Sequence, residues 1–465
     1  MTELRSKWIG DRAFYRRMLA VMLPVLIQNV ITNFVSLLDN IMVGQVGTEA
    51  MSGVAIVNQL LFVFNLCIFG GLSGPGIFTA QFFGRGDDDG VRHTVRLKWY
   101  IALAAVALFG AALALFGEPL ISLFLHEGEA DIDLAATLSF GQSYLWVMLA
   151  GLLPFAVMQV YGSTLRECGE TLLPMKAGVA AILINLTLNY VLIFGKLGFP
   201  ALGVVGAAIA TVIARVAECA IVVIWAHCHA DRHRYIRGLY RSPNVPTKLL
   251  KRVAFKGVPL LLNEVLWSAG MTLLNQCYSV RGVEVVSAVN ISSTIWNLFF
   301  CALFATGTTI AIMIGQRLGA GELEAAIDED RKLIAFAVTL SAVTAALMAI
   351  FAPLIPNLYN TEPEVKALAT RFLWICAVLM PFNALTNSCY FTLRSGGKTA
   401  ITFLFDSGFI WAVCAPTALA LVHGTKLPIL WVFAVVQSLE LIKVAIGLTL
   451  LRRRSWVNNL VENLY

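Results

Sequence analysis

Charged side chains are scarce in this chain of 465 residues. Asp, Glu, Lys and Arg together make up 13% of it, whereas soluble domains carry about 25%. Hydrophobic residues make up 58%, and the mean hydropathy is +0.77. This composition excludes an ordinary soluble domain and indicates that lipid is the solvent for most of the chain.

Motifs of the common enzyme chemistries are also missing. The sequence has no phosphate-binding loop, no H-E-x-x-H helix, no G-x-S-x-G elbow and no C-x-x-C pair. We therefore expect neither an enzyme nor a resident cofactor. One polar run resembles a metal site, and we interpret it as a polar collar at the membrane interface. It consists of His227, Cys228, His229, Asp231 and His233.

Long apolar segments make up most of what is present. Most of them reach the ~20 residues that a helix needs to cross the hydrocarbon, where no water could satisfy the backbone of an irregular segment. The sequence therefore predicts an all-α membrane protein with twelve transmembrane helices. Their approximate ranges are 18–43, 50–83, 94–116, 139–161, 172–194, 203–228, 254–280, 288–315, 333–355, 369–393, 400–422 and 428–450.

The basic residues between these segments predict the topology. With a cytoplasmic N-terminus, nearly all Lys and Arg fall in cytoplasmic segments, so the positive-inside rule places both termini in the cytoplasm. We expect a monomeric, multi-pass protein of the inner (plasma) membrane, with the lipid bilayer and no nucleic acid as its partner. The net charge of +6 then reflects topology. The basic residues expected outside are Lys196, Arg281, Lys366, Arg371 and Lys426.

An internal repeat divides the chain into two halves. Shifting the sequence by 235 residues superposes Pro24 on Pro259, Asn40 on Asn275, Gln81 on Gln316, Gly84 on Gly319 and Gly86 on Gly321. A shift of 228 superposes Arg166 on Arg394 and Gly169 on Gly397. We predict an N-lobe at 1–230, a basic cytoplasmic linker at 231–252 and a C-lobe at 253–465. Parallel six-helix repeats are typical of secondary transporters, whose substrate site lies near the midplane between the halves.

Seven ionisable residues fall inside the apolar segments. Each would cost about 2.5–3.5 kcal/mol at a helix centre, so they must face the protein interior, a water-filled cavity or each other. Opposite charges three residues apart on one helix can neutralise each other. Four of the seven residues form two such pairs, and each pair is either structural or part of the transport pathway. The seven are Asp39, Glu264 and Asp406, and the pairs Arg215 with Glu218 and Glu440 with Lys443.

Asp39, Glu264 and Asp406 have no basic neighbour on their own helix, and we interpret them as functional. Asp39 continues a polar stripe of Gln28, Thr32 and Ser36. A carboxylate removed from water can carry a proton near neutral pH, and with neutral oxygens around it can hold Na⁺. Either ion would compete with a cationic substrate for the same negative charge, and this competition is the basis of antiport. Ordinary packing is the alternative for the expected pocket residues, which are Gln28, Trp267, Met271, Trp296 and Phe299.

Three motifs resemble the bacterial branch of the multidrug and toxic compound extrusion (MATE) family. They are LDNIMVG at 38–44, LRECGET at 165–171 and GVVGAAIAT at 203–211. The resemblance implies a V-shaped pair of six-helix lobes that exports cationic amphipathic compounds by alternating access, driven by H⁺ or Na⁺. It also implies an ion site at Asp39, a helix bend at Pro24 and acids of the C-lobe that bind cation or substrate. Those acids are Glu264, Asp406 and Glu440.

The helix at 172–194 departs from that family pattern. One branch carries an Asn and an Asp four residues apart beside the first-helix acid, and the same positions here are Asn185 and Asn189. The N-lobe cluster of Asp39, Asn185 and Asn189 then has one acid where that branch has two.

Two other transporter classes share the general plan. A major-facilitator transporter expects a basic residue where Gly84–Arg92 reads GRGDDDGVR. A lipid-linked precursor flippase of related fold is the alternative function, and it favours a basic cavity for pyrophosphate. The buried excess here is acidic, which favours organic cations as substrates.

Overall fold

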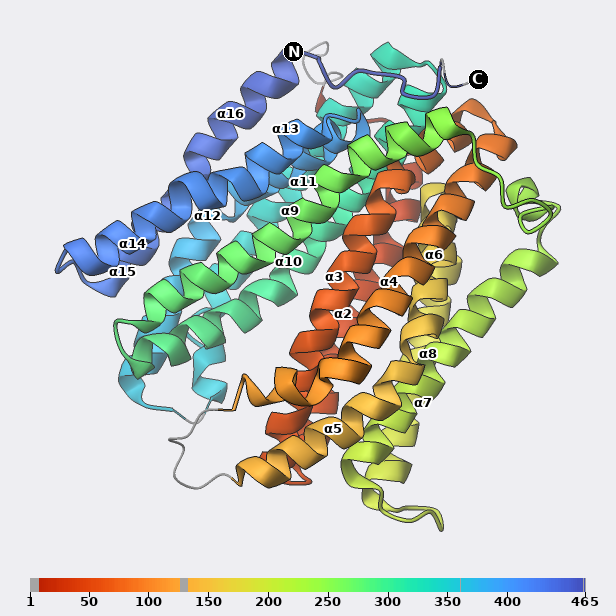
Figure 1. Ribbon diagram of the computed structural model, residues 1–465. Helices are drawn as coiled ribbons and strands as arrows, with labels where there is room; N and C mark the ends of the chain where they lie inside the picture. Colours follow the sequence, from red (N-terminus) through yellow and green to blue (C-terminus); the bar gives the residue numbers. More distant parts are fainter. Residues whose placement is uncertain (1–7, 126–132, 360, 463, 465) are drawn as a thin grey trace. The chain divides into compact units, whose positions relative to one another are not determined.

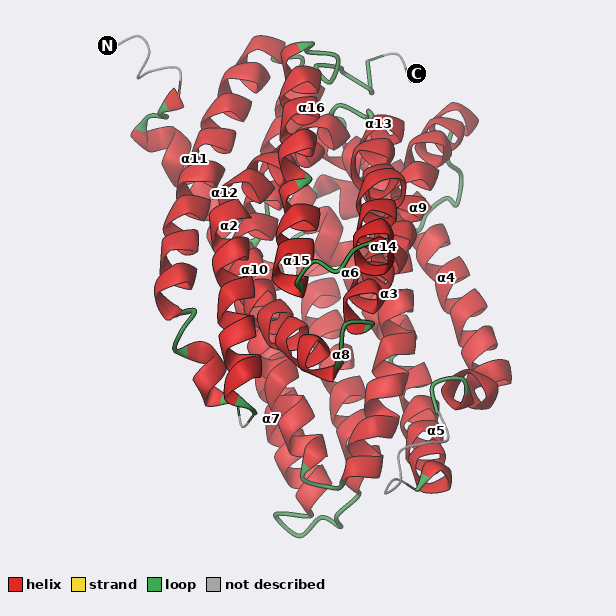
Figure 2. Cartoon of the chain, turned by 90° about the vertical axis from the view of Figure 1, so that its left-hand side faces the viewer, coloured by secondary structure: helices red, strands yellow, loops and turns green. Residues whose placement is uncertain are grey.

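Helices form all the regular structure of the residues that the computed structural model describes, which are 8–125, 133–359, 361–462 and 464 (Figures 1 and 2). The first half of the chain contains α2 (Arg12–Gly44), α3 (Thr48–Arg85), α4 (Asp88–Ser122), α5 (Leu134–Ala150), α6 (Leu152–Glu167), α7 (Leu172–Phe194) and α8 (Gly203–Cys228). The second half contains α9 (Thr247–Ser279), α10 (Val283–Gly319), α11 (Leu323–Phe351), α12 (Pro363–Ser395), α13 (Thr399–Phe403), α14 (Ala415–Gly424), α15 (Ile429–Ser438) and α16 (Glu440–Arg452).

The described helices account for the twelve predicted spans. Eleven of them are long and apolar enough to cross a membrane, counting α13–α14 and α15–α16 as one span each. The twelfth is the pair α5 and α6, which is bent by 46° at Gly151. The predicted all-α membrane fold is confirmed, and the span predicted at 139–161 corresponds to this bent pair.

Contacts divide the chain into two compact units. The N-unit comprises Ile27–Thr79 and Asp87–Lys251, and the C-unit comprises the described residues up to Leu26, Ala80–Gly86 and the chain from Arg252 onward. Both α2 and α3 therefore change unit along their length, shortly after Pro24 in α2 and Pro75 in α3. A proline interrupts the hydrogen-bond ladder of a helix, so each helix is weakened close to the point where its packing partners change.

Small residues allow close helix contacts in the N-unit. Helix α8 packs against α5, α6 and α7. A Cβ atom at Gly206 of α8 would meet the Leu192 carbonyl oxygen of α7 at 2.6 Å, and one at Gly53 would meet the Thr137 carbonyl oxygen at the same distance. Glycine at such positions lets two membrane helices approach closely enough for dispersion attraction. This attraction is important because the hydrophobic effect contributes little to the association of helices in lipid.

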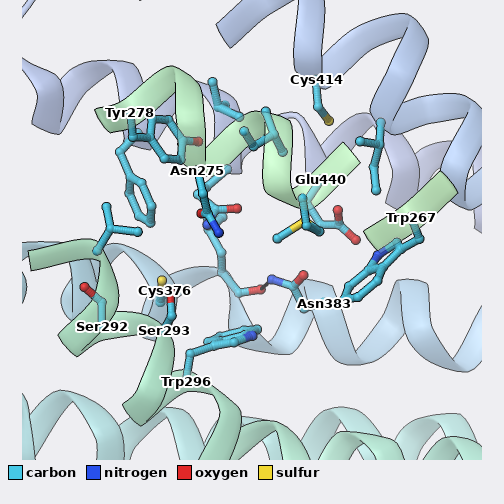
Figure 3. A pocket seen from close by; sticks show the side chains of 18 of the residues that line it. Trp267, Asn275, Tyr278, Ser292, Ser293, Trp296, Cys376, Asn383, Cys414 and Glu440 are labelled. Carbon is cyan, nitrogen blue, oxygen red and sulfur yellow. Dashed lines mark hydrogen bonds between the residues drawn. The ribbon is translucent and has the colours of Figure 1, made fainter. Parts of the chain in front are cut away.

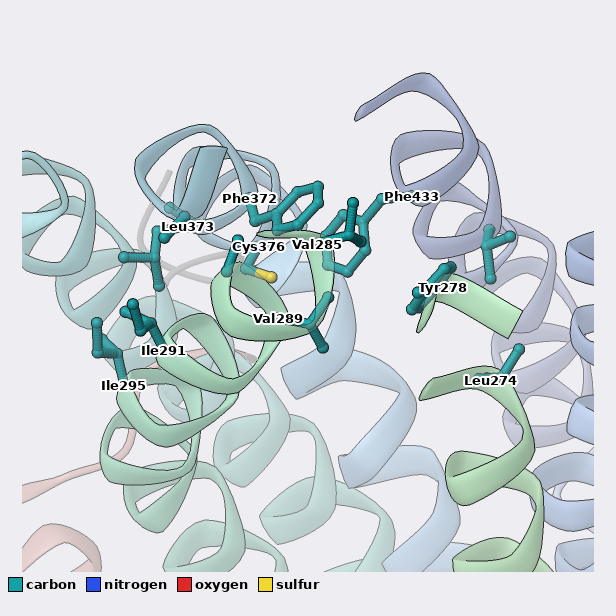
Figure 4. Close-up of a cluster of buried hydrophobic side chains, with 14 of the residues drawn as sticks. Leu274, Tyr278, Val285, Val289, Ile291, Ile295, Phe372, Leu373, Cys376 and Phe433 are labelled. Atoms are coloured by element: carbon teal, nitrogen blue, oxygen red, sulfur yellow. The ribbon is translucent and has the colours of Figure 1, made fainter. Parts of the chain in front are cut away.

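The C-unit has an apolar core between α10, α12 and α15 (Figure 4). The ring centroids of Phe372 and Phe433 lie 4.4 Å apart, and Phe372 is fully buried. Cys376 belongs to this core, where it packs as a small apolar residue. This core fixes the helices that carry the polar residues described below.

The internal repeat is visible in the backbone of the C-unit. Gly84 lies against the Gln316 carbonyl oxygen, and its repeat partner Gly319 lies against the Gln81 carbonyl oxygen, with room for no Cβ atom in either case. Gly86 and its partner Gly321 have positive φ angles of 77° and 78°. The same turn thus follows α3 and α10, and it requires glycine both times.

Two spans of the C-unit are irregular near their middle. Leu404–Gly408 and Ile410–Cys414, between α13 and α14, are π-helical. In the next span a turn at Leu439 separates α15 from α16. Such irregular turns re-aim side chains and often mark functional positions in membrane helices. They place Asp406 and Glu440 in the interior of the unit.

Candidate functional site

A cavity of about 490 Å³ lies within the N-unit, and we call it the N-unit cavity. It lies between α2, α3, α5, α7 and α8, and polar side chains form much of its wall. Helix α8 contributes Ala207, Thr211 and Arg215, which share one face because they are four residues apart. The other polar lining residues are Asp39, Asn40, Asn58, Gln59, Asn65, Tyr144 and Asn189.

Asp39 is held in this cavity by neutral amides. Asn189 Nδ2 donates to Asp39 Oδ1 at 2.7 Å. The hydrogen-bonding surroundings orient the Asn185 amide so that its nitrogen donates to both Asp39 oxygens, at 2.9 and 3.1 Å, while its oxygen accepts from Thr211 Oγ1 at 3.3 Å. The predicted cluster of Asp39, Asn185 and Asn189 is therefore brought together, with Thr211 as an additional member.

Arg215 lines the same cavity and has no carboxylate as a close partner. Among the described residues no ion pair includes it, and its Nη1 is buried without a hydrogen-bond acceptor. The guanidinium carbon lies 5.0 Å from the centroid of the Phe155 ring. Glu218 acts on Arg215 at longer range and is shared with Arg166. The Arg215–Glu218 pair expected from their spacing is thus no direct contact.

A second cavity of about 190 Å³ lies within the C-unit (Figure 3), and we call it the C-unit cavity. Three aromatic side chains, Trp267, Trp296 and Tyr278, lie around it with the amides Asn275 and Asn383. Glu440 and Lys443 also line it. The wall therefore combines flat aromatic faces with ionisable side chains.

Lys443 binds two carboxylates beside this cavity. Its Nζ lies 2.8 Å from Asp406 Oδ1 and 4.0 Å from Glu440 Oε1. Asn263 Nδ2 donates to the other Asp406 oxygen at 3.1 Å, and Thr386 Oγ1 donates to Glu440. Two acids thus surround one base, and every ionised group in this cluster has a partner.

Asn263 connects α9 to the π-helical turn that carries Asp406. The Asn263 amide oxygen accepts from both the backbone nitrogen and the hydroxyl of Ser407, at 3.3 and 2.8 Å. Glu264, the next residue of α9, interacts electrostatically with Arg394 and Asp406. The predicted acids Glu264, Asp406 and Glu440 therefore belong to one neighbourhood in the C-unit.

The predicted pocket residues are found in three different places. Trp267, Met271 and Trp296 line the C-unit cavity. Phe299 packs against the apolar core of the C-unit, and Gln28 lies beside Gly178 and near Glu218 in the N-unit. Pro24 lies inside α2, and the side chain of Ser36 is outside the described residues.

Several lining residues were missed in the sequence. Asn58, Gln59 and Asn65 lie in the apolar middle stretch of α3, and Asn58 and Asn65, two helical turns apart, could have indicated one polar face. Lys98, in the first turns of α4, is also fully buried, with its Nζ 2.5 Å from Glu167 Oε2.

The polar run at the end of α8 makes separate aromatic contacts. The hydroxyl of Tyr161 and His227 Nε2 are 2.9 Å apart, and the His229 ring stacks on Trp225 at 4.2 Å. Within the described ranges no three His, Cys, Asp or Glu side chains come together as a metal site. The contact between Tyr161 and His227 ties α8 to α6.

Known proteins resemble this chain over most of its length. The MatE family model matches residues 24–191 and 259–407. The chain is 28% identical to the multidrug resistance protein MdtK of Pectobacterium atrosepticum, over 86% of each. It is 24% identical to the probable multidrug resistance protein NorM of Thermotoga maritima, over 89% of this chain and 87% of that protein.

Solved structures show the same fold. A crystal structure of the Vibrio cholerae MATE transporter VcmN superposes with a TM-score of 0.84 at 21% identity, covering 97% of this chain and 98% of that one. A transporter of the MOP superfamily from Pyrococcus furiosus superposes with a TM-score of 0.81 at 20% identity, covering 97% of both. Because the family model matches more than half of the sequence, the chain belongs to the MatE family and is a MATE membrane transporter.

Proposed function

We propose that this protein exports organic, mostly cationic amphipathic compounds across the cytoplasmic membrane by antiport with H⁺ or Na⁺. The observation that carries the proposal is the separation of two polar centres within the membrane-spanning region. Asp39 is held among neutral amides, whereas the acids of the C-unit adjoin an aromatic cavity. The relatives named as multidrug resistance proteins support the substrate class.

The C-unit cavity supports binding of cations. Trp267 and Trp296 offer π faces that attract a delocalised or quaternary cation, and Glu440 supplies negative charge at the same wall. Flat apolar rings accept many ligand shapes, because stacking requires no directional hydrogen bond. A planar aromatic cation is therefore the class of substrate that suits this cavity.

The Asp39 cluster supports ion coupling. A proton on Asp39 would remove the charge that the amides of Asn185 and Asn189 stabilise. Na⁺ would instead find the carboxylate together with neutral oxygens, among them Asn189 Oδ1, which is buried without a partner among the described residues. Binding of either ion would change the net charge of the N-unit cavity. Such a change is required if ion binding is to be coupled to substrate export.

The location and assembly belong to the same proposal. A multi-pass monomer of the inner (plasma) membrane with both termini in the cytoplasm suits the distribution of basic residues in the sequence. The two lobes would then expose the cavities alternately to the two sides. No cofactor is needed beyond the coupling ion.

The test uses inside-out vesicles from a host without its own drug pumps, in which export appears as dye uptake. We expect a proton or Na⁺ gradient to drive uptake of ethidium in the parent, and Asp39→Asn to reduce that uptake at least tenfold. Loss of about 1.4 kcal/mol of coupling free energy would already produce this factor. Asn33→Gln, on the same helix, serves as the expression control.

The two gradients are applied separately, so the same experiment identifies the coupling ion. Parent vesicles that respond to neither gradient would contradict antiport. Full uptake by Asp39→Asn would exclude Asp39 as the coupling residue and leave export itself intact.

A further inference from the structure

Two lysines at one end of the C-unit have no acidic partner. Lys256 lies in the third turn of α9, and Lys398 directly precedes α13. The charge of Lys398 acts on Lys256, and among the described residues no carboxylate forms an ion pair with either side chain. Like charges that are held close together repel each other, so an anion bound between them would be stabilised by both.

The packing of α9 against the following span explains why the two lysines are neighbours. Farther along both helices, the Ser407 hydroxyl donates to the Asn263 amide oxygen at 2.8 Å. Lys256 precedes Asn263 by about two helical turns, and Lys398 precedes Ser407 by about the same distance. Figure 1 shows the start of α9 and α13 at the same end of the unit. The lysines therefore occupy the outer end of this helix pair.

An exposed apolar strip leads from the lysines along α9. It consists of Phe255, Val258 and Leu262, which share one face because they are three and four residues apart. Leu404 on the neighbouring span is exposed as well. The Lys256 Nζ lies 5.7 Å from the centroid of the Phe255 ring, and that ring is 74% exposed. In a membrane such a strip faces lipid tails, while a lysine at the end of the helix reaches the headgroups.

The internal repeat does not require these lysines. The shift of 235 residues superposes Val21 on Lys256, and the shift of 228 superposes Glu170 on Lys398. Glu170 forms an ion pair with Arg232 at 3.3 Å. The corresponding positions of the first half are therefore apolar and acidic, and the two lysines are a feature of the second half alone.

We propose that Lys256 and Lys398 bind the phosphate of an anionic phospholipid whose acyl chain lies along the exposed strip of α9. A phosphodiester between the two ammonium groups accepts charge-assisted hydrogen bonds from both and relieves their repulsion. With the cytoplasmic termini proposed above, the lysines lie at the cytoplasmic membrane surface, where basic residues attract anionic lipid. The bound lipid ties α9 to the span that carries Asp406.

The experiment measures lipid binding to the purified full-length protein in detergent by native mass spectrometry. The probes are dioleoyl phosphatidylglycerol, which is anionic, and dioleoyl phosphatidylcholine, which has the same acyl chains and a zwitterionic headgroup. The variants are the double replacements Lys256→Gln with Lys398→Gln, and Lys256→Arg with Lys398→Arg. Lys176→Gln is the matched control, because Lys176 is an exposed lysine near the start of α7, the helix that corresponds to α13 in the repeat.

We expect the parent to bind phosphatidylglycerol about thirtyfold more tightly than phosphatidylcholine, which corresponds to about 2 kcal/mol, or about 1 kcal/mol for each lysine. The double glutamine variant should lose this preference. The double arginine variant should keep it, because a guanidinium also donates to phosphate, and Lys176→Gln should keep it too. Equal binding of the two lipids by the parent, or an unchanged preference in the double glutamine variant, would overturn the inference. An equal loss in Lys176→Gln would also overturn it, because the attraction would then be a general effect of surface charge.

Inorganic phosphate distinguishes a lipid site from a site for free anions. It offers the same kind of oxygen without acyl chains, so an equal concentration should leave phosphatidylglycerol bound, and displacement would overturn the assignment to lipid. Thermal unfolding in the same detergent shows whether each variant is folded. If the double glutamine variant is unstable, Lys398→Gln takes its place, with an expected loss of about fivefold in affinity. The assay contains no ion gradient and no exported compound, so its outcome is separate from that of the transport test.

Discussion

The two cavities of this transporter contain the same kinds of charged group in opposite arrangements. In the C-unit cavity the base is saturated, because Lys443 lies between Asp406 and Glu440. In the N-unit cavity the acid is saturated by amides, and the base Arg215 has no carboxylate in contact among the described residues. The backbone was duplicated, while the charges inside the two copies diverged.

The difference concerns stability as well as binding. A paired charge in a low-dielectric interior holds its partners in place, and removing one member leaves the others uncompensated. An unpaired charge is already uncompensated before any ligand arrives. The C-unit cluster should therefore contribute to folding, whereas Arg215 should contribute mainly to function.

The largest expected effect is a contrast in thermal stability between Lys443→Met and Arg215→Met. Lys443→Met leaves Asp406 and Glu440 without their base and should destabilise the protein by about 3–5 kcal/mol. Arg215→Met replaces an unpaired charge with an apolar chain of similar length, so we expect no loss of stability or a small gain. Thermal unfolding in detergent, followed by size-exclusion chromatography, measures both. Equal losses in the two variants would show that Arg215 also has a structural partner.

A smaller effect is expected where the two halves are alike. Gly84→Ala and Gly319→Ala would each drive a Cβ atom to within 1.9 Å of a carbonyl oxygen across the crossing of α3 and α10. Overpacking of this kind costs about 1–3 kcal/mol, and the two losses should be similar because the contacts are reciprocal. Gly110→Ala is the control, since its nearest contact would be 3.9 Å away. Clearly unequal losses would mean that the crossing has lost its symmetry.

Much of the fold could be predicted from the sequence because helices in lipid are specified locally. A long apolar run must satisfy its own backbone, so twelve spans followed from length and hydropathy alone. The repeat of Gly86 and Gly321 was also predictable, since both positions need the same backbone conformation. The bend at Gly151 was not, because it depends on how α5 and α6 pack against neighbouring helices.

The site was predicted in its residues but less well in its contacts. Asp39, Asn185 and Asn189 meet as expected, because a family resemblance indicated their helix faces. The spacing of Glu440 and Lys443 suggested a local pair, whereas the shorter contact of Lys443 is with Asp406 on a different span. Spacing along one helix carries no information about which face of another helix a residue meets.

The smallest expected effect concerns His233, in the connection after α8, which belongs to the N-unit. Burial lowers the pKa of the His233 imidazole, and the positive charge of Arg232 lowers it further. The folded protein thus favours neutral His233, while the unfolded chain takes up a proton below about pH 6.5. Stability should therefore be complete above that pH and fall as the pH drops toward the lower folded pKa.

His233→Gln should remove this pH dependence, which we expect to amount to about one degree in Tm between pH 7.5 and 5.5. His229→Gln is the matched control, because His229 is exposed and should leave the dependence in place. This result helps to interpret the comparison of the cavities. A pH profile of transport reports two effects together, namely titration of groups inside the N-unit cavity and destabilisation of the connection outside it. A profile that persists in His233→Gln then belongs to the cavities, and one that disappears would assign the pH response to this connection.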